Sequence, residues 1–178
     1  MKPLLWILLA LTLVGCGSGK KELHLYTWAE LIDAEAIIAF EKKYNCRVIV
    51  DNYDSNETLY AKLKSGAGGY DVIVPTWYYV QVLDKQGMLK KLDISKIPNR
   101  QFLDERYLKP LGKGDLSTSF PFVISTQGIG YRADRVREAP DSWTIFGDKA
   151  YRKRMTLMND LREVIGAALM VLGYSPNT

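Results

Sequence analysis

Three short groups of aromatic, hydroxyl and acidic residues are the parts of this chain best suited to chemistry. They are residues 76–79 (TWYY), residues 28–30 (WAE), and the pair Asp160 and Glu163. The first two groups follow predicted strands, and in open α/β sheets ligands bind in the crevice outside the carboxyl ends of the strands. Aromatic rings and carboxylates without a nucleophile beside them indicate recognition of a small molecule, and not a reaction performed on it.

Each group also has a purely structural interpretation. An aromatic residue at the end of a strand belongs to a hydrophobic core at least as often as to a binding wall. The spacing of Asp160 and Glu163 is that of a capping box, in which the two residues satisfy each other's backbone amides at the start of a helix. Carboxylates at that position are also stabilised by the helix dipole. The sequence alone leaves both interpretations open.

The chain lacks the groupings that common enzymes use. It contains no Gly-x-Ser-x-Gly elbow and no metal-ligand spacing. Its single histidine, His24, lies inside a predicted strand, and one histidine without a second His or Cys nearby cannot form a zinc site. The glycine-rich residues 66–69 precede a strand, so they offer no helix N-terminus to a phosphate. The basic residues are interleaved with acids at a net charge of +4, unlike a nucleic-acid-binding stripe. We therefore predict no enzyme, no cofactor and no nucleic-acid partner.

Local patterns predict alternating strands and helices over the first part of the chain. Strands are expected at residues 22–28, 47–50 and 72–74, and a helix follows each of them. Asp33 is expected to cap the first helix and Ser55 the second, which should end at Gly66. The last of the three strands should be buried and should stop at Pro75. This β-α-β-α-β-α order predicts an α/β fold with a largely parallel sheet.

After residue 92 the pattern loosens, and a second unit begins. Strands are predicted at residues 119–124, 128–131 and 155–158, and a helix at about residues 161–172, with Gly173 just after it. The polar break at residues 125–127 is typical of a crossover between domains. We expect a first lobe at residues 22–125 and the start of a second, truncated lobe at residues 126–178, which is too short to bury a core of its own.

The first fifteen residues read as an export signal. Lys2 precedes the apolar residues 4–14, a run too short to span a bilayer stably. Residues 13–16 (LVGC) resemble the bacterial lipobox, so residues 1–15 are predicted to be a signal peptide and Cys16 the lipid carrier. Residues 16–21 would then be a short tether. An uncleaved anchor and an ordinary secretion signal are the alternatives.

Taken together, residues 53–63, 69–79, 159–164 and 172–175 resemble the bacterial spermidine/putrescine-binding proteins, the extracytoplasmic receptors of polyamine ABC importers. The resemblance implies a two-lobed fold of the periplasmic-binding-protein type (type 2) that closes over its ligand. It also implies a polyamine ligand, a membrane permease as partner, and a lipid-anchored protein in the periplasm or another extracytoplasmic space.

The resemblance assigns six ligand-binding residues, namely Trp28, Glu30, Thr76, Tyr78, Asp160 and Glu163. Asp160 and Glu163 match the acidic pair that grips one amine terminus, and Trp28 matches an aromatic residue of the ligand box. Glu30 and Tyr78 match polar contacts, and Thr76 matches a serine beside the pocket.

Two departures from the family concern the ligand. Ala29 stands where a hydroxyl is usual, and Leu31 where the spermidine-binding relatives have a tyrosine. The choice between spermidine and putrescine therefore stays open. Family members are also much longer, which suggests a truncated reading frame or a cut sequence. The alternatives are a receptor of the same fold for another small solute, and a surface lipoprotein without a transport role.

Overall fold

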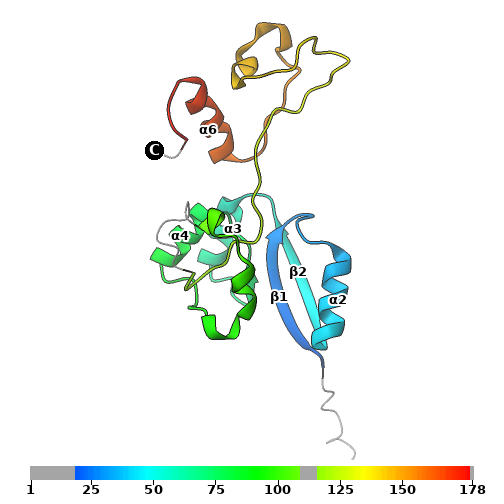
Figure 1. The fold of residues 1–178 in the computed structure, drawn as a ribbon, viewed down its shortest axis with the longest axis vertical. Coiled ribbons are helices and arrows are strands. Elements are labelled where there is room, and N and C mark those ends of the chain that lie inside the picture. The colour runs from blue at the N-terminus through cyan, green and yellow to red at the C-terminus, as the bar shows by residue number, and fades with distance from the viewer. Residues whose placement is uncertain (1–18, 109–115, 177–178) are drawn as a thin grey trace, which may run out of the picture. The chain divides into compact units, whose positions relative to one another are not determined.

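The computed structural model describes residues 19–108 and 116–176. The signal peptide and the lipidated Cys16 that the sequence predicts lie outside the described residues. The longer elements are β1 (Lys21–Trp28), α2 (Ala34–Tyr44), β2 (Cys46–Tyr53), α3 (Asn56–Lys64), β3 (Val72–Ile73), α4 (Trp77–Lys85) and α6 (Leu161–Val171) (Figure 1). Shorter helical turns are η1 (Ile94–Lys96), η2 (Pro98–Phe102), α5 (Glu105–Leu108), η4 (Trp143–Gly147) and η5 (Lys149–Tyr151). The predicted β-α-β-α-β-α order is confirmed.

The chain divides into two compact units. The first, which we call the sheet unit, comprises residues 1–53 and 61–75; the second, the helical unit, comprises residues 54–60 and 76–178. The three strands found among the described residues lie in the sheet unit, in the order β2-β1-β3. Both pairings of β1 are parallel, and its register with β2 runs from Lys21 opposite Cys46 to Trp28 opposite Tyr53. The parallel sheet that the sequence predicts is therefore confirmed.

The edge strand β3 differs from its prediction. It is two residues long, and the Val72 side chain is 43 % exposed, so the expectation of a buried strand is wrong at Val72. The physical reason is that β3 has a paired neighbour on one side, whereas β1 is paired on both and buries Leu25 and Tyr26. The backbone amide of Val74 still donates to the carbonyl of Tyr26 at 3.0 Å. Pro75 follows and has no amide hydrogen, so the ladder stops there as predicted.

The predicted helix starts are confirmed by their caps. The Asp33 carboxylate accepts from the amide of Glu35 at 2.7 Å at the start of α2. The Ser55 hydroxyl accepts from the amide of Thr58 at 3.1 Å at the start of α3. Gly66, just past α3, has a φ of +84°, a left-handed conformation that a residue without a Cβ adopts at little cost.

In the helical unit, the three strands predicted between residues 119 and 158 do not form. Figure 1 draws residues 119–131 as plain extended chain, and no strand is assigned to them or to residues 155–158. A strand requires a neighbour for its backbone hydrogen bonds, and the described residues provide none here. The apolar side chains of Phe122 and Val123 are 64 % and 58 % exposed. The predicted last helix does form, as α6, and Gly173 after it has a φ of +82°.

Candidate functional site

Thr76 and Tyr78 lie at the start of α4 and are joined through a buried side chain of α3. Thr76 has an extended backbone at the N-cap, and Tyr78 is in the first turn. The Asn56 side chain is completely buried. Its Nδ2 donates to the Thr76 hydroxyl at 3.0 Å and to the Tyr78 hydroxyl at 3.1 Å, and its Oδ1 accepts from the Thr76 amide at 3.0 Å. The two predicted site residues are thus held together.

The environment of Tyr78 keeps its hydroxyl neutral. Burial is the main cause that raises the pKa of Tyr78 to about 12; the negative charge of Asp160 contributes to this rise, and the hydrogen bond with Asn56 opposes it. Tyr78 therefore offers a protonated hydroxyl at physiological pH. The guanidinium carbon of Arg162 lies 4.6 Å from the centre of its ring, within the range of a cation–π interaction. The ring thus already accommodates a cation.

Asp160 and Glu163 lie at the N-terminus of α6, as predicted. Asp160 is the N-cap residue, and its Oδ1 accepts from the amide of Glu163 at 3.1 Å, so its predicted capping role is confirmed. Partial burial and the adjacent charge of Asp160 raise the pKa of Glu163, while the neighbouring Arg162 lowers it. Two carboxylates that repel each other in this way would both be stabilised by a bound cation.

Trp28 and Glu30 belong to the sheet unit. Trp28 ends β1, where its ring lies 4.6 Å from that of Tyr53, and its backbone carbonyl accepts from the side-chain Nδ2 of Asn52 at 3.2 Å. Glu30 is exposed, with a φ of +58° in the turn that follows. Left-handed residues other than glycine occur in turns and, often, at functional sites. Trp28 is half-buried.

The structure thus brings four of the six predicted residues into one unit and leaves two in the other. Asn56 bridges Thr76 and Tyr78, and the charge of Asp160 at the α6 N-terminus acts on Tyr78. Sequence reasoning missed Asn56 and Arg162. A polar residue in the first turn of a helix is ordinary, so the sequence carried no signal that Asn56 would be buried against residues twenty positions away.

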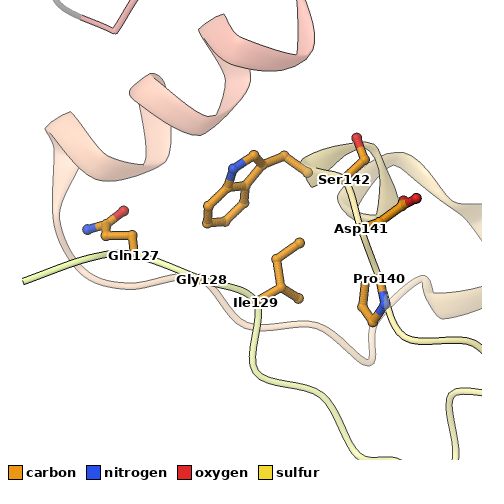
Figure 2. Close-up of a pocket in the computed structure, with 7 residues that line it drawn as sticks. Gln127, Gly128, Ile129, Pro140, Asp141 and Ser142 are labelled. Carbon is orange, nitrogen blue, oxygen red and sulfur yellow. The ribbon is translucent and has the colours of Figure 1, made fainter.

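A separate pocket of the helical unit contains none of the predicted residues. Figure 2 shows Gln127, Gly128 and Ile129 on one segment, facing Pro140, Asp141 and Ser142 on another. Trp143 completes the lining, and the cavity has a volume of about 190 Å³. It is therefore not the site to which the sequence analysis pointed.

These features define a class of protein. A parallel α/β sheet unit, neutral hydroxyls held by a buried amide, and carboxylates beside a cation-bearing ring are the features of an α/β protein that binds a small solute. No group of three or more His, Cys, Asp or Glu residues that could hold a metal occurs in the described part of the chain. Within the same residues, no helix is long and apolar enough to cross a membrane.

The chain belongs to the bacterial extracellular solute-binding protein family, whose model matches residues 35–178. It is 39 % identical over 159 residues to spermidine/putrescine-binding periplasmic protein 1 of Haemophilus influenzae, covering 87 % of this chain and 44 % of that protein. It is 36 % identical to the putrescine-binding periplasmic protein SpuD of Pseudomonas aeruginosa, covering 96 % and 52 % of the two chains. The chain thus spans about half the length of these curated relatives.

The solved structures agree. The crystal structure of the TpPotD lipoprotein of Treponema pallidum matches with a TM-score of 0.83 at 39 % identity, covering 89 % of this chain and 50 % of that one. The spermidine/putrescine substrate-binding protein PotD of Streptococcus pneumoniae matches with a TM-score of 0.70 at 32 % identity, covering 89 % and 49 %. The family and the periplasmic-binding-protein fold class predicted from the sequence are confirmed.

Proposed function

We propose that the complete protein is the extracytoplasmic substrate-binding component of an ABC importer for polyamines. The observation that carries this proposal is the position of the acidic pair: Asp160 and Glu163 lie together at the start of α6, and the charge of Asp160 acts on the Tyr78 side chain. Carboxylates beside an aromatic ring have the chemistry that a protonated amine requires. The names of the relatives, which bind spermidine or putrescine, support this ligand class.

The ligand's own chemistry explains the residue types. A polyamine is an apolar methylene chain that carries ammonium groups, and burying those charges requires carboxylate partners. In this proposal Asp160 and Glu163 pair with one terminal ammonium. The Trp28 and Tyr78 rings flank the methylene chain, with cation–π contributions of about 0.5–2 kcal/mol each. Thr76 and Glu30 supply further polar contacts.

The location and partners follow from the same proposal. Signal removal before Cys16, and acylation of its thiol, would anchor the protein at a membrane surface in the periplasm or an equivalent extracytoplasmic space. There it would deliver ligand to a permease. Residues 22–125 would form the first lobe and residues 126–178 the beginning of the second. Metabolic labelling with a labelled fatty acid tests the anchor: the protein should incorporate the label, and Cys16→Ser should not.

Isothermal titration of the full chain with putrescine and with spermidine tests the function. Saturable binding of either polyamine is the expected result. A control titration with sodium chloride in place of the polyamine should give no saturable binding. Titrations with amino acids, sugars and thiamine run alongside. Saturation by one of these, and not by polyamines, would identify a receptor for another solute. No binding of any of them by folded protein would indicate a surface lipoprotein without a transport role.

A further inference from the structure

Asn56 is a buried polar residue of the helical unit, and its carboxamide forms three hydrogen bonds. It lies at the first residue of α3 and bonds to residues 20 and 22 positions further along the chain. All three of its bonds, at 3.0, 3.1 and 3.0 Å, end on Thr76 or Tyr78. Because the side chain is 0 % exposed, water cannot replace these bonds if they are lost.

The orientation of the amide is determined by one of its partners. The backbone amide of Thr76 can only donate, so the atom facing it must be the oxygen, Oδ1. The Nδ2 group then faces the two hydroxyls, and its two hydrogens go to Thr76 Oγ1 and Tyr78 Oη. Each hydroxyl therefore accepts from Asn56 and keeps its own proton to donate elsewhere, and the Thr76 hydroxyl oxygen has a second lone pair left to accept.

This arrangement matters for a cationic ligand. An ammonium group offers only hydrogen-bond donors, so a hydroxyl can bind it only through a free lone pair. A hydroxyl oxygen held at a fixed place with a lone pair available binds without the loss of rotational freedom that an unrestrained side chain incurs. We propose that Asn56 is a positioning residue of the polyamine site, which acts through Thr76 and Tyr78 and does not itself touch the ligand. This inference rests on the proposed function.

The test is a double-mutant cycle in the full chain, with putrescine and spermidine as titrants. Asn56→Ala is expected to weaken binding roughly tenfold or more, the effect of losing bonds to buried groups. In a Tyr78→Phe background the same change should have a clearly smaller effect, because one of the groups that Asn56 positions has already been removed. The control is Tyr60→Phe, which removes a bond from the Tyr60 hydroxyl on α3 to Gln86, the C-cap residue of α4. It should leave affinity unchanged.

Additive effects in the cycle, or unchanged affinity in Asn56→Ala, would overturn the inference, since a purely structural residue weakens binding independently of Tyr78. If Asn56→Ala does not fold, Asn56→Ser, which can retain one of the three bonds, is measured in the same way. Hydrogen exchange at the Thr76 amide needs no ligand and is expected to accelerate in the Asn56 variants. Wild-type protein that binds no polyamine would refute the proposed function, and the exchange rate would still show whether Asn56 holds Thr76.

Discussion

The guanidinium of Arg162, from the first turn of α6, lies over the ring of Tyr78, from the first turn of α4, at 4.6 Å. Both residues sit beside groups that the sequence marks as ligand-binding: Thr76 on one helix, and Asp160 and Glu163 on the other. The pair shows that this end of the helical unit tolerates a positive charge against an aromatic face. The predictions below test what that environment does to ligand binding, pKa values and stability.

The acidic pair can be separated from its capping role. In Asp160→Asn the cap is retained, because Asn and Asp are comparable at the N-cap, but the charge is lost. Asp160→Asn and Glu163→Gln, made separately, are each expected to weaken polyamine binding by about 2–5 kcal/mol, the penalty for removing one member of a buried charge pair. Isothermal titration of the full chain measures the effect. Asp148→Asn is the matched control, since Asp148 caps η5 by accepting from Ala150 at 2.8 Å. Unchanged affinity in both variants would assign the pair to capping alone.

Arg162 should control the protonation of Glu163. Its positive charge lowers the pKa of Glu163, against the raising effects of burial and Asp160. Arg162→Gln is therefore expected to raise the pKa of Glu163 further, as measured by carbon NMR titration of labelled glutamate. Arg152→Gln, a charge removal at an exposed position, serves as the control and should leave the resonance unchanged. A lower pKa in Arg162→Gln would mean that another contact of Arg162 dominates.

Glu163 should make the protein less stable as the pH rises. Its pKa is raised in the folded state above the ordinary 4.5, so the native state binds more protons than the unfolded state between those two values. Stability contributed by this group is present below pH 4.5 and is lost as the pH rises through the folded pKa. Thermal melts of wild type and Glu163→Gln across this window should show a smaller fall in the variant. Parallel curves would contradict the raised pKa.

Asp51 in the sheet unit should have the opposite pH dependence. Its carboxylate accepts from the Tyr70 hydroxyl at 2.5 Å and from Lys62 at 3.2 Å, and these bonds lower its pKa. Stability from Asp51 is therefore present above its unfolded pKa and is lost as the pH falls through the lower folded value. Because the Asp51 side chain is 47 % exposed, solvent screens much of this contribution, so Asp51→Asn is expected to lower the melting temperature at neutral pH only slightly. The difference from wild type should vanish in acid, and a constant difference would refute the assignment.

Polyamine binding should weaken in acid for a related reason. Ligand ammonium groups favour the ionised carboxylate, so lowering the pH through the raised pKa of Glu163 replaces a charge partner by a neutral acid. Titrations at several pH values should show affinity falling below that pKa, with proton release on binding near it. Glu163→Gln should bind weakly and lose most of this dependence. An affinity independent of pH in the wild type would argue that Glu163 does not contact the ligand.

Much of the local structure follows from short patterns in the sequence. The strand and helix order, and the caps at Asp33, Ser55 and Asp160, were predictable because periodicity and capping act between residues a few positions apart. The parallel pairing followed from the alternation of strands and helices. The family resemblance named the candidate ligand-binding residues, and their contact with a polyamine stays a prediction.

Only the tertiary structure decided which of these residues share a network. The bonds of Asn56 to Thr76 and Tyr78 join positions 20 and 22 apart, and nothing local distinguishes Asn56 from any other polar residue in a first helical turn. The strands expected within residues 119–131 do not form, for a similar reason. Residues 119–124 have a strand's pattern of side chains, but a strand exists only where a neighbouring backbone accepts and donates its hydrogen bonds. That partner is set by the fold and not by the segment itself.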